Sequence, residues 1–216
     1  MELKNYIEHT LLKQDGTKEE LIKLFDEAIK YDFLGVCINP CHVKFASEYL
    51  KDYATKIVTV IGFPLGASKT EVKAFEANQA VKDGADEIDM VLNVGEMKNK
   101  NYDFIFHDVQ SVKKACEDKK LKVILETDLL TPEEIKKATE LCVEAGCDFV
   151  KTSTGFVKNG VGATVEAVEI MASVVKNTNV QIKASAGIKT ADKAIALINA
   201  GASRLGTSSG VALIDN

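Results

Sequence analysis

The chain alternates along its whole length between two patterns of hydrophobic positions. Short apolar runs rich in β-branched residues, typical of buried strands, cover 6–11, 33–38, 56–61, 87–92, 122–126, 149–152, 180–184 and 203–206. Between them lie segments with helical spacing, at 17–31, 42–50, 68–83, 103–117, 131–145, 164–176 and 190–200. This alternation predicts an α/β fold in which helices connect parallel strands.

The junctions between helices and strands repeat one short pattern. Gly84, Gly146 and Gly201 each follow a helical segment and stand shortly before the next strand. A glycine at this place predicts a helix end in the left-handed conformation. Eight strands and seven helices arranged in this way fit a single-domain TIM (β/α)₈ barrel that spans residues 1–216. The alternative is an open doubly wound sheet, which the lack of a G-x-G-x-x-G turn after the first strand disfavours.

One helical segment is predicted to pack on the sheet through a narrow stripe of small residues. In the segment 68–83 this stripe consists of Thr70, Ala74, Ala77 and Val81. The segment 131–145 opens with Thr-Pro-Glu-Glu. This is a typical helix start, because proline fits the first turn and the acids lie at the positive end of the helix dipole.

Composition and charge limit the class of protein. Of the 216 residues 46% are hydrophobic and 27% are charged, as in ordinary globular domains. The net charge of −5 argues against a nucleic-acid partner. No apolar stretch is long enough for a membrane span and no secretory signal follows Met1, so we expect a cytoplasmic protein. The cysteines form no C-x-x-C pair and the histidines no H-E-x-x-H motif, so we expect no metal and no cofactor.

Two lysines lie within otherwise apolar strands, Lys151 in 149–152 and Lys183 in 180–184. Removing an ammonium group from water costs several kcal/mol, so a buried lysine needs a partner or a purpose. Successive strands of a barrel are neighbours about 4.8 Å apart, which places the two lysines side by side. The charge of one should then lower the pKa of the other from ~10.4 toward ~7, and the neutral amine could form a Schiff base.

Purely structural explanations for these residues stay open. Lys151 could extend past the barrel rim into solvent. Lys183 could form an ion pair with Asp89 or Glu126, each near the end of another strand. Asp89 could cap a helix instead of serving in the reaction. The presence of all these residues at one end of the barrel favours a catalytic site, because that end carries the active site in TIM barrels.

The last loops predict an anion site. Gly187 follows the strand of Lys183, and Gly-Thr-Ser-Ser-Gly at 206–210 follows the last strand. Small residues let backbone N–H groups approach a phosphate, and barrels often bind phosphate after strands seven and eight. Gly155, just after Lys151, would close this cradle.

Together these motifs are similar to those of the deoxyribose-phosphate aldolase family. The resemblance covers about residues 3–213 and is carried by Lys-Thr-Ser-Thr-Gly-Phe at 151–156, Lys-Ala-Ser at 183–185 ahead of Gly187, Glu-Ile-Asp-Met-Val at 87–91, His-Thr-Leu-Leu at 9–12 and Gly-Thr-Ser-Ser at 206–209. It implies a cytoplasmic, homodimeric class I aldolase of deoxyribose catabolism, without metal or cofactor. The implied reaction reversibly cleaves 2-deoxy-D-ribose 5-phosphate to D-glyceraldehyde 3-phosphate and acetaldehyde.

The resemblance also implies the roles of individual residues. Lys151 would form the Schiff base, Lys183 would lower its pKa, and Asp89 would transfer protons through a water molecule. The implied phosphate-binding residues are Gly155, Gly187, Gly206, Ser208 and Ser209. The other implied substrate-binding residues are Thr10, Asn39 and Thr154, with the Cys37 thiol close by and not the nucleophile.

Three positions depart from the family pattern. Glu8 stands where most members have aspartate at the substrate's hydroxyl end, and Ala186 stands where many have glycine. The sequence ends Ile-Asp-Asn, whereas many members have a tail with a terminal tyrosine. We therefore expect a lower turnover than is typical of the family.

Two other functions stay open at this stage. The first is a lysine-dependent barrel acting on a different sugar phosphate, which would differ at the residues that read the hydroxyls, here Thr10, Asn39 and Asp89. The second is a barrel that binds a phosphorylated metabolite without turnover. Retention of both lysines and Asp89 disfavours this sensor, because binding alone does not need a strained pair of amines.

Overall fold

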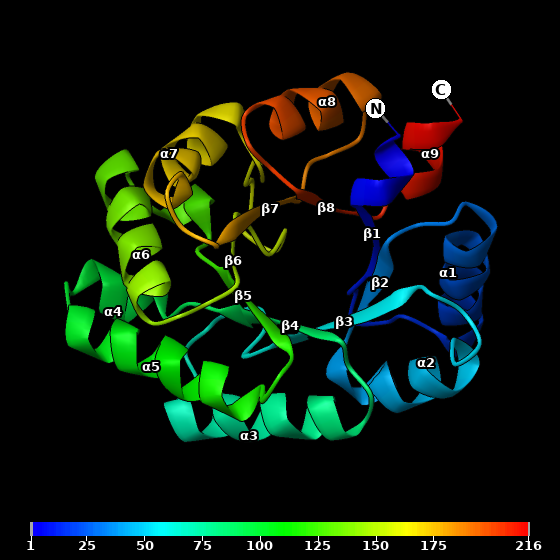
Figure 1. Ribbon diagram of the computed structural model, residues 1–216, viewed down its shortest axis with the longest axis horizontal. Coiled ribbons are helices and arrows are strands. Elements are labelled where there is room, and N and C mark those ends of the chain that lie inside the picture. The colour runs from blue at the N-terminus through cyan, green and yellow to red at the C-terminus, as the bar shows by residue number, and fades with distance from the viewer. Residues whose placement is uncertain (1, 216) are drawn as a thin grey trace.

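The strands form a closed parallel barrel, as the alternating pattern predicts. The computed structural model describes residues 2–215, with helices ringing the barrel (Figure 1). The strands are β1 (Ile7–Leu11), β2 (Gly35–Ile38), β3 (Lys56–Ile61), β4 (Glu87–Val91), β5 (Lys120–Ile124), β6 (Phe149–Lys151), β7 (Gln181–Ser185) and β8 (Arg204–Thr207). Each pairs in parallel with the next, and β8 pairs with β1 to close the sheet. The TIM-barrel prediction is confirmed, and the open sheet is excluded.

The helices lie outside the barrel. The α-helices are α1 (Lys18–Lys30), α2 (Val43–Tyr49), α3 (Thr70–Lys82), α4 (Val94–Lys98), α5 (Tyr102–Ala115), α6 (Pro132–Glu144), α7 (Val165–Val175), α8 (Ala191–Asn199) and α9 (Gly210–Ile214). Short 3₁₀ turns are η1 (Leu3–Tyr6), η2 (Pro40–His42) and η3 (Thr127–Leu129). The sequence pattern does not predict α4, α9 or the 3₁₀ turns, because so few residues carry no helical period. Near the two chain ends, η1 lies against α9 (Figure 1).

Helix ends follow the signals in the sequence. Thr131 caps α6 through a capping box with Glu134, and Pro132 is the first helical residue. Gly84, Gly146 and Gly201 all have positive φ. After each glycine, the next N–H donates to a carbonyl five residues earlier, as in Ala85 N to Ala80 O at 3.0 Å. This bond is that of the Schellman motif, which ends the helix and turns the chain directly into the next strand.

The buried face of α3 is shifted from the predicted stripe, although Ala77 of that stripe is fully buried and Val81 packs against the core. The buried residues are Lys73, Ala77 and Ala80, while Thr70, Ala74 and Val81 are only half-buried. The helix is rotated because Lys73 points inward, where its Nζ contacts Asp108 of α5 at 2.6 Å and donates to the Val91 carbonyl. Sequence periodicity misses this face, since it assigns a lysine to the solvent side.

The Lys73–Asp108 pair is expected to contribute strongly to stability. Both side chains are fully buried. Lys73→Met leaves the Asp108 carboxylate without its cation, so the free energy of unfolding should fall by about 3 kcal/mol. Urea denaturation measures this change. The double variant with Asp108→Asn should recover part of the loss, and a single variant as stable as the wild type would contradict the expectation.

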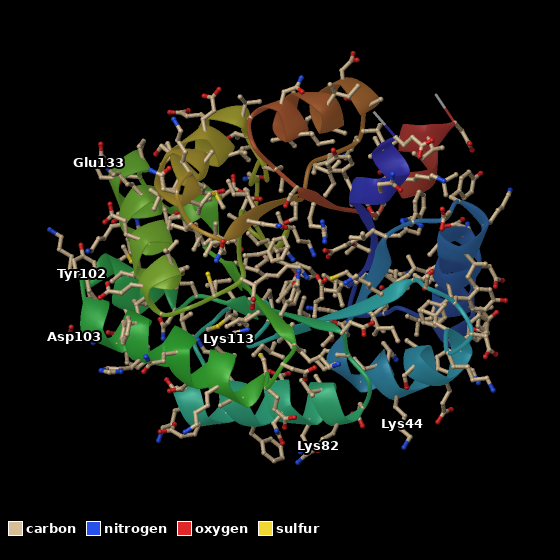
Figure 2. All side chains as sticks on the ribbon, viewed as in Figure 1. Lys44, Lys82, Tyr102, Asp103, Lys113 and Glu133 are labelled. Carbon is tan, nitrogen blue, oxygen red and sulfur yellow. The ribbon has the colours of Figure 1, made fainter. Side chains whose placement is uncertain are left out.

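The hydrophobic core lies between the strands and the helices, and the inside of the barrel is largely polar. Alternation along β4 directs Ile88 and Met90 into the outer core, while Glu87 and Asp89 face the interior. In Figure 2 the labelled side chains of Lys44, Lys82 and Glu133 point away from the barrel. The charged side chains that face the interior therefore form a group separate from those on the outer surface.

Candidate active site

Six charged side chains converge inside the barrel. Each is at most 3% exposed, and they are Glu8, Glu87, Asp89, Lys122, Lys151 and Lys183. They come from β1, β4, β5, β6 and β7, and their contacts cross the interior from one wall to another. Neighbouring Cys37 and Val58, from β2 and β3, fill the space beside them. The barrel therefore contains a buried cluster of three acidic and three lysine side chains.

The two predicted lysines are direct neighbours. Lys151 and Lys183 occupy paired positions of β6 and β7. Lys151 Nζ lies 2.8 Å and Lys183 Nζ 2.7 Å from the same atom, Oδ2 of Asp89. Lys183 also donates to Glu8. Lys151 is buried and does not extend into solvent, and Lys183 forms the ion pair with Asp89 and none with Glu126.

The charges of the cluster hold the pKa values of its members apart. Burial acts to raise the pKa of Asp89, but Lys122, Lys151 and Lys183 outweigh it and hold that pKa well below its usual value. Burial acts to lower the pKa of Lys183, but Asp89 and Glu8 outweigh it and hold that pKa well above its usual value. At neutral pH, Asp89 is thus a carboxylate and Lys183 an ammonium group.

Cys37 lies in the same interior. The side chain is fully buried, and burial raises the pKa of its thiol above the usual value. A thiol that is protonated at neutral pH is a poor nucleophile, which agrees with the expectation that Cys37 is not the reacting group.

A cavity of 410 Å³ opens above the cluster at the carboxyl ends of β1, β6, β7 and β8. The predicted residues that line it are Thr10, Lys151, Thr154, Gly155, Gly187, Gly206, Ser208 and Ser209. Asp89, Lys183 and Cys37 do not line it, since they lie buried beneath its floor. Asn39 lies away from the cavity, and its amide donates to the Leu12 carbonyl at 3.4 Å.

Glu8 belongs to the buried charged cluster. Its carboxylate is fully buried, contacts Lys183 and lies 3.5 Å from Lys122 Nζ. It does not line the cavity. Because it faces the interior lysines, Glu8 acts on the charge of the cluster, and its contact with the substrate's hydroxyl end stays a prediction.

Sequence reasoning missed two further lysines at the cavity. Lys13, after β1, and Lys189, after β7, are lining residues. Among the described residues that line the cavity there is no aspartate or glutamate, so the charge of Lys13 and Lys189 is not offset by an acidic side chain. Their strands flank β8. The charge of the cavity is thus suited to an anion. The sequence signal that could have identified these two lysines is their place in loops beside the glycine motifs.

Lys122 was missed for a different reason. The predicted run 122–126 begins at this residue, so a lysine there resembles an exposed strand end. In the structure β5 is Lys120–Ile124, which places Lys122 in its middle and fully buried. Its Nζ lies 2.6 Å from Glu87, 2.9 Å from Asp89 and 3.5 Å from Glu8.

Two acids after β5 hold the loop that follows Lys151. Glu126, at φ 61°, accepts bonds from the backbone N–H and the hydroxyl of Thr154. Burial raises the pKa of Glu126, and the bonds from Thr154 offset only part of this effect. Asp128 accepts from the N–H groups of Val161 and Gly162 at 2.9 and 3.0 Å. The wall of the cavity is thereby tied to β5.

The anion loop is tightly packed. Gly187 has φ +69°, and a Cβ there would lie 2.4 Å from the Val161 carbonyl oxygen. Ala186, the residue that departs from the family's glycine, also has a positive φ of 68°. An alanine in this conformation costs about 1 kcal/mol relative to glycine. The loop therefore keeps its shape through the surrounding contacts rather than through a glycine at 186.

The carboxylates also define the candidate metal position of the described residues. Donor atoms of Glu8, Cys37 and Asp89 lie within 4.8 Å of one another. Both carboxylates already accept hydrogen bonds from lysine ammonium groups, which supply the positive charge that such oxygens need. We therefore still expect that this position binds no metal ion.

Comparison with known proteins gives a consistent family relation. Residues 4–214 match the DeoC/LacD family of aldolases. The deoxyribose-phosphate aldolase of Mycoplasma capricolum is 55% identical over 99% of this chain and 95% of its own. That of Finegoldia magna is 51% identical over 100% of both. A solved structure from Aeropyrum pernix, described as a tetrameric deoxyribose phosphate aldolase, superposes with a TM-score of 0.91 at 32% identity, covering 99% of this chain and 89% of that one.

The structure also bears on the membrane expectation. Among residues 2–215, none of the helices is long and apolar enough to cross a bilayer.

Proposed function

Because this chain belongs to the DeoC/LacD family of aldolases, we propose that it reversibly cleaves 2-deoxy-D-ribose 5-phosphate to D-glyceraldehyde 3-phosphate and acetaldehyde, with Lys151 forming the Schiff base. The protein is a carbon–carbon lyase, as are its full-length relatives that are more than half identical to it. One observation carries the assignment of Lys151. Of the six buried charged residues, it alone also lines the cavity, so its amine joins the cluster to the substrate space.

The first chemical step forms the imine. Neutral Lys151 Nζ attacks the C1 aldehyde of the open-chain sugar, and the resulting carbinolamine loses its hydroxyl as water. That departure needs a proton. Lys183 is placed to supply it, because its ammonium group is held on the same Asp89 oxygen as Lys151. The product is a protonated imine that can accept an electron pair.

Cleavage then breaks the C2–C3 bond. The C3 hydroxyl gives its proton through a water to Asp89, and C3 becomes the aldehyde carbon of D-glyceraldehyde 3-phosphate. The electron pair of the broken bond enters the imine, which becomes an enamine. Protonation of C2 and hydrolysis by water release acetaldehyde and restore the Lys151 amine. Asp89 and Lys183 suit these transfers because they are an acceptor and a donor 2.7 Å apart.

The phosphate is expected at the opposite side of the cavity from the Schiff base. Backbone N–H groups of the loops at Gly187 and at 206–209 would bind it, with Gly155 closing the cradle. Lys13 and Lys189 also line the cavity, and their positive charges would attract the phosphate dianion of the substrate. The phosphate would thus fix the sugar so that C1 faces Lys151.

Trapping with borohydride tests the assignment. Incubation with acetaldehyde and borohydride should add one ethyl group to the protein, and peptide mapping should place it on Lys151. Cleavage of 2-deoxyribose 5-phosphate, followed by the release of glyceraldehyde 3-phosphate, tests the substrate independently. A protein that binds the sugar phosphate but traps no aldehyde would be the sensor rather than the aldolase.

The phosphate site is best tested at Ser208, which is exposed. Gly187 is unsuitable because any side chain there would meet the Val161 carbonyl and displace the loop. Ser208→Asp should raise the KM for the phosphorylated sugar about tenfold or more, since its carboxylate repels the phosphate. The matched control Ser208→Asn adds the same bulk without charge and should change KM little. An equal loss on unphosphorylated 2-deoxyribose would mean that the loop is structural.

Two properties inferred from the family resemblance stay predictions for this chain. A homodimer is expected, and its size is measurable by light scattering. A cytoplasmic location is expected as well, and cell fractionation tests it.

A further inference from the structure

Lys122 is the lysine of the buried cluster that the reaction above does not use. It lies opposite Asp89 in the pairing of β4 with β5 and is fully buried. Its Nζ donates to Asp89 Oδ1 at 2.9 Å, whereas Lys151 and Lys183 bind Oδ2. It also contacts Glu87 at 2.6 Å. Lys122 therefore holds one oxygen of the carboxylate whose other oxygen the two catalytic lysines share.

The position of Lys122 excludes contact with substrate. It does not line the cavity and lies below Lys151 in the barrel, near the ring of Phe149 at 5.7 Å. Burying a lysine without an ion-pair partner is costly. Lys122 contacts three carboxyl groups, so its positive charge stabilises the ionised form of each. Its effect on the reaction must pass through those carboxylates.

The charges of the cluster balance when Lys122 is present. Glu8, Glu87 and Asp89 match the three ammonium groups when every residue is ionised. Without Lys122, three acidic side chains would face two lysines in the buried interior of the barrel. The simplest way to reduce that excess negative charge is for Lys151 to hold its proton more tightly, and a protonated amine cannot form the Schiff base.

We propose that Lys122 is a positioning residue of the aldol reaction, which orients Asp89 and balances the charge of the interior carboxylates around the Lys151 amine. This inference rests on the proposed function of Lys151 as the Schiff-base amine. Asp89, held at both oxygens, keeps one fixed orientation toward Lys151 and Lys183.

The groups that face Lys151 and Lys122 come from several walls of the barrel. The charged or titratable groups around Lys151 are Asp89 of β4, Lys183 of β7, Cys37 of β2 and Glu126 after β5. Those around Lys122 are Asp89, Glu87, Glu8 and Lys183. On β3 the interior neighbours are Val58 and Val60, and β8 contributes Gly206 beside Lys183 and Arg204 over Phe149. Burial acts to lower the pKa of Lys122, but Asp89 and Glu8 outweigh it and raise that pKa.

Glu87 offers a way to separate charge from packing. It contacts Lys122 at the lower end of the cluster, and its second partner, Lys56, is 39% exposed and can be solvated without it. Glu87→Gln removes one negative charge, and Lys122→Met removes one positive charge with little change in volume. The double variant Lys122→Met/Glu87→Gln lacks one positive and one negative charge, so the net charge of the cluster is the same as in the wild type.

The experiment measures kcat/KM for 2-deoxyribose 5-phosphate from mildly acidic to alkaline pH in the full-length protein. In Lys122→Met the acidic limb of the pH profile should move upward by about one pH unit. At pH values on that limb, kcat/KM should then be about tenfold lower than in the wild type. In Glu87→Gln the limb should move downward, because the site then has excess positive charge. The double variant should return toward the wild-type limb. Lys73→Met is the matched control, since it also removes a fully buried lysine, and its limb should not move.

The outcomes distinguish this inference from the function on which it rests. If borohydride treatment of the wild type gave no adduct at Lys151, the proposed function would be overturned. A normal adduct together with an unmoved limb in Lys122→Met, or no return in the double variant, would overturn the role of Lys122. If Lys122→Met does not fold, Glu87→Gln alone decides, because it leaves Lys122 on Asp89, and an unmoved limb there contradicts the charge balance.

Discussion

Lys151→Ala is expected to abolish the aldehyde adduct and to lower the rate of cleavage by about 10⁴-fold or more. Without the imine, the electron pair released when the C2–C3 bond breaks would have to enter the aldehyde as an enolate anion, which is much less stable than the neutral enamine. Among the buried lysines, Lys151 is the one that lines the cavity. Neither Lys183 nor Lys122 can take over without a change in the barrel, because both lie beneath the cavity floor.

Lys151→Arg is the matched variant. It keeps a positive charge opposite Asp89, which lies 2.8 Å from the native ammonium nitrogen, but a guanidinium does not lose its proton at the pH of the experiment. Folding should therefore be retained and trapping lost. Mass spectrometry of borohydride-treated protein measures the adduct, and circular dichroism checks the fold. Undiminished trapping in Lys151→Ala, or an adduct mapped to Lys183 in the wild type, would overturn the assignment.

Lys183→Leu is expected to keep slow trapping at Lys151 while the pH optimum of trapping moves upward. The variant removes a cation whose Nζ contacts Asp89 and Glu8. Two buried carboxylates are then left with fewer ammonium groups, and Lys151 holds its proton to higher pH. Loss of the proton donor should also lower turnover by about 10² to 10⁴-fold.

The direction of the pH shift is the informative part of this prediction. A variant that merely damages packing would lower trapping equally at every pH. The charge argument instead requires the loss to be largest at mildly acidic pH and smaller at alkaline pH, where Lys151 is neutral in both proteins. Trapping followed across a pH series in wild type, Lys183→Leu and Lys73→Met separates the two explanations. An optimum that stays in place or moves downward would contradict it.

The fold and half of the site were determined by local sequence. The short apolar runs, the helical segments and the glycines at 84, 146 and 201 predict the barrel because each signal acts within a few residues. The pairing of Lys151 with Lys183 also follows, since consecutive strands of a barrel are neighbours and both lysines point inward at matching positions. Wherever the chemistry lies on adjacent strands, the sequence order is enough.

The rest depended on contacts between segments that are distant in the chain. Glu8 meets Lys183 across 175 positions because the barrel closes between β1 and β8, and no local pattern encodes that meeting. Lys122 and Lys73 were hidden since hydrophobic periodicity assigns lysines to solvent, whereas each is fully buried against carboxylates from other elements. Which residues line the cavity and which lie under its floor was decided by tertiary structure alone, because side-chain depth in a closed barrel depends on all eight walls at once.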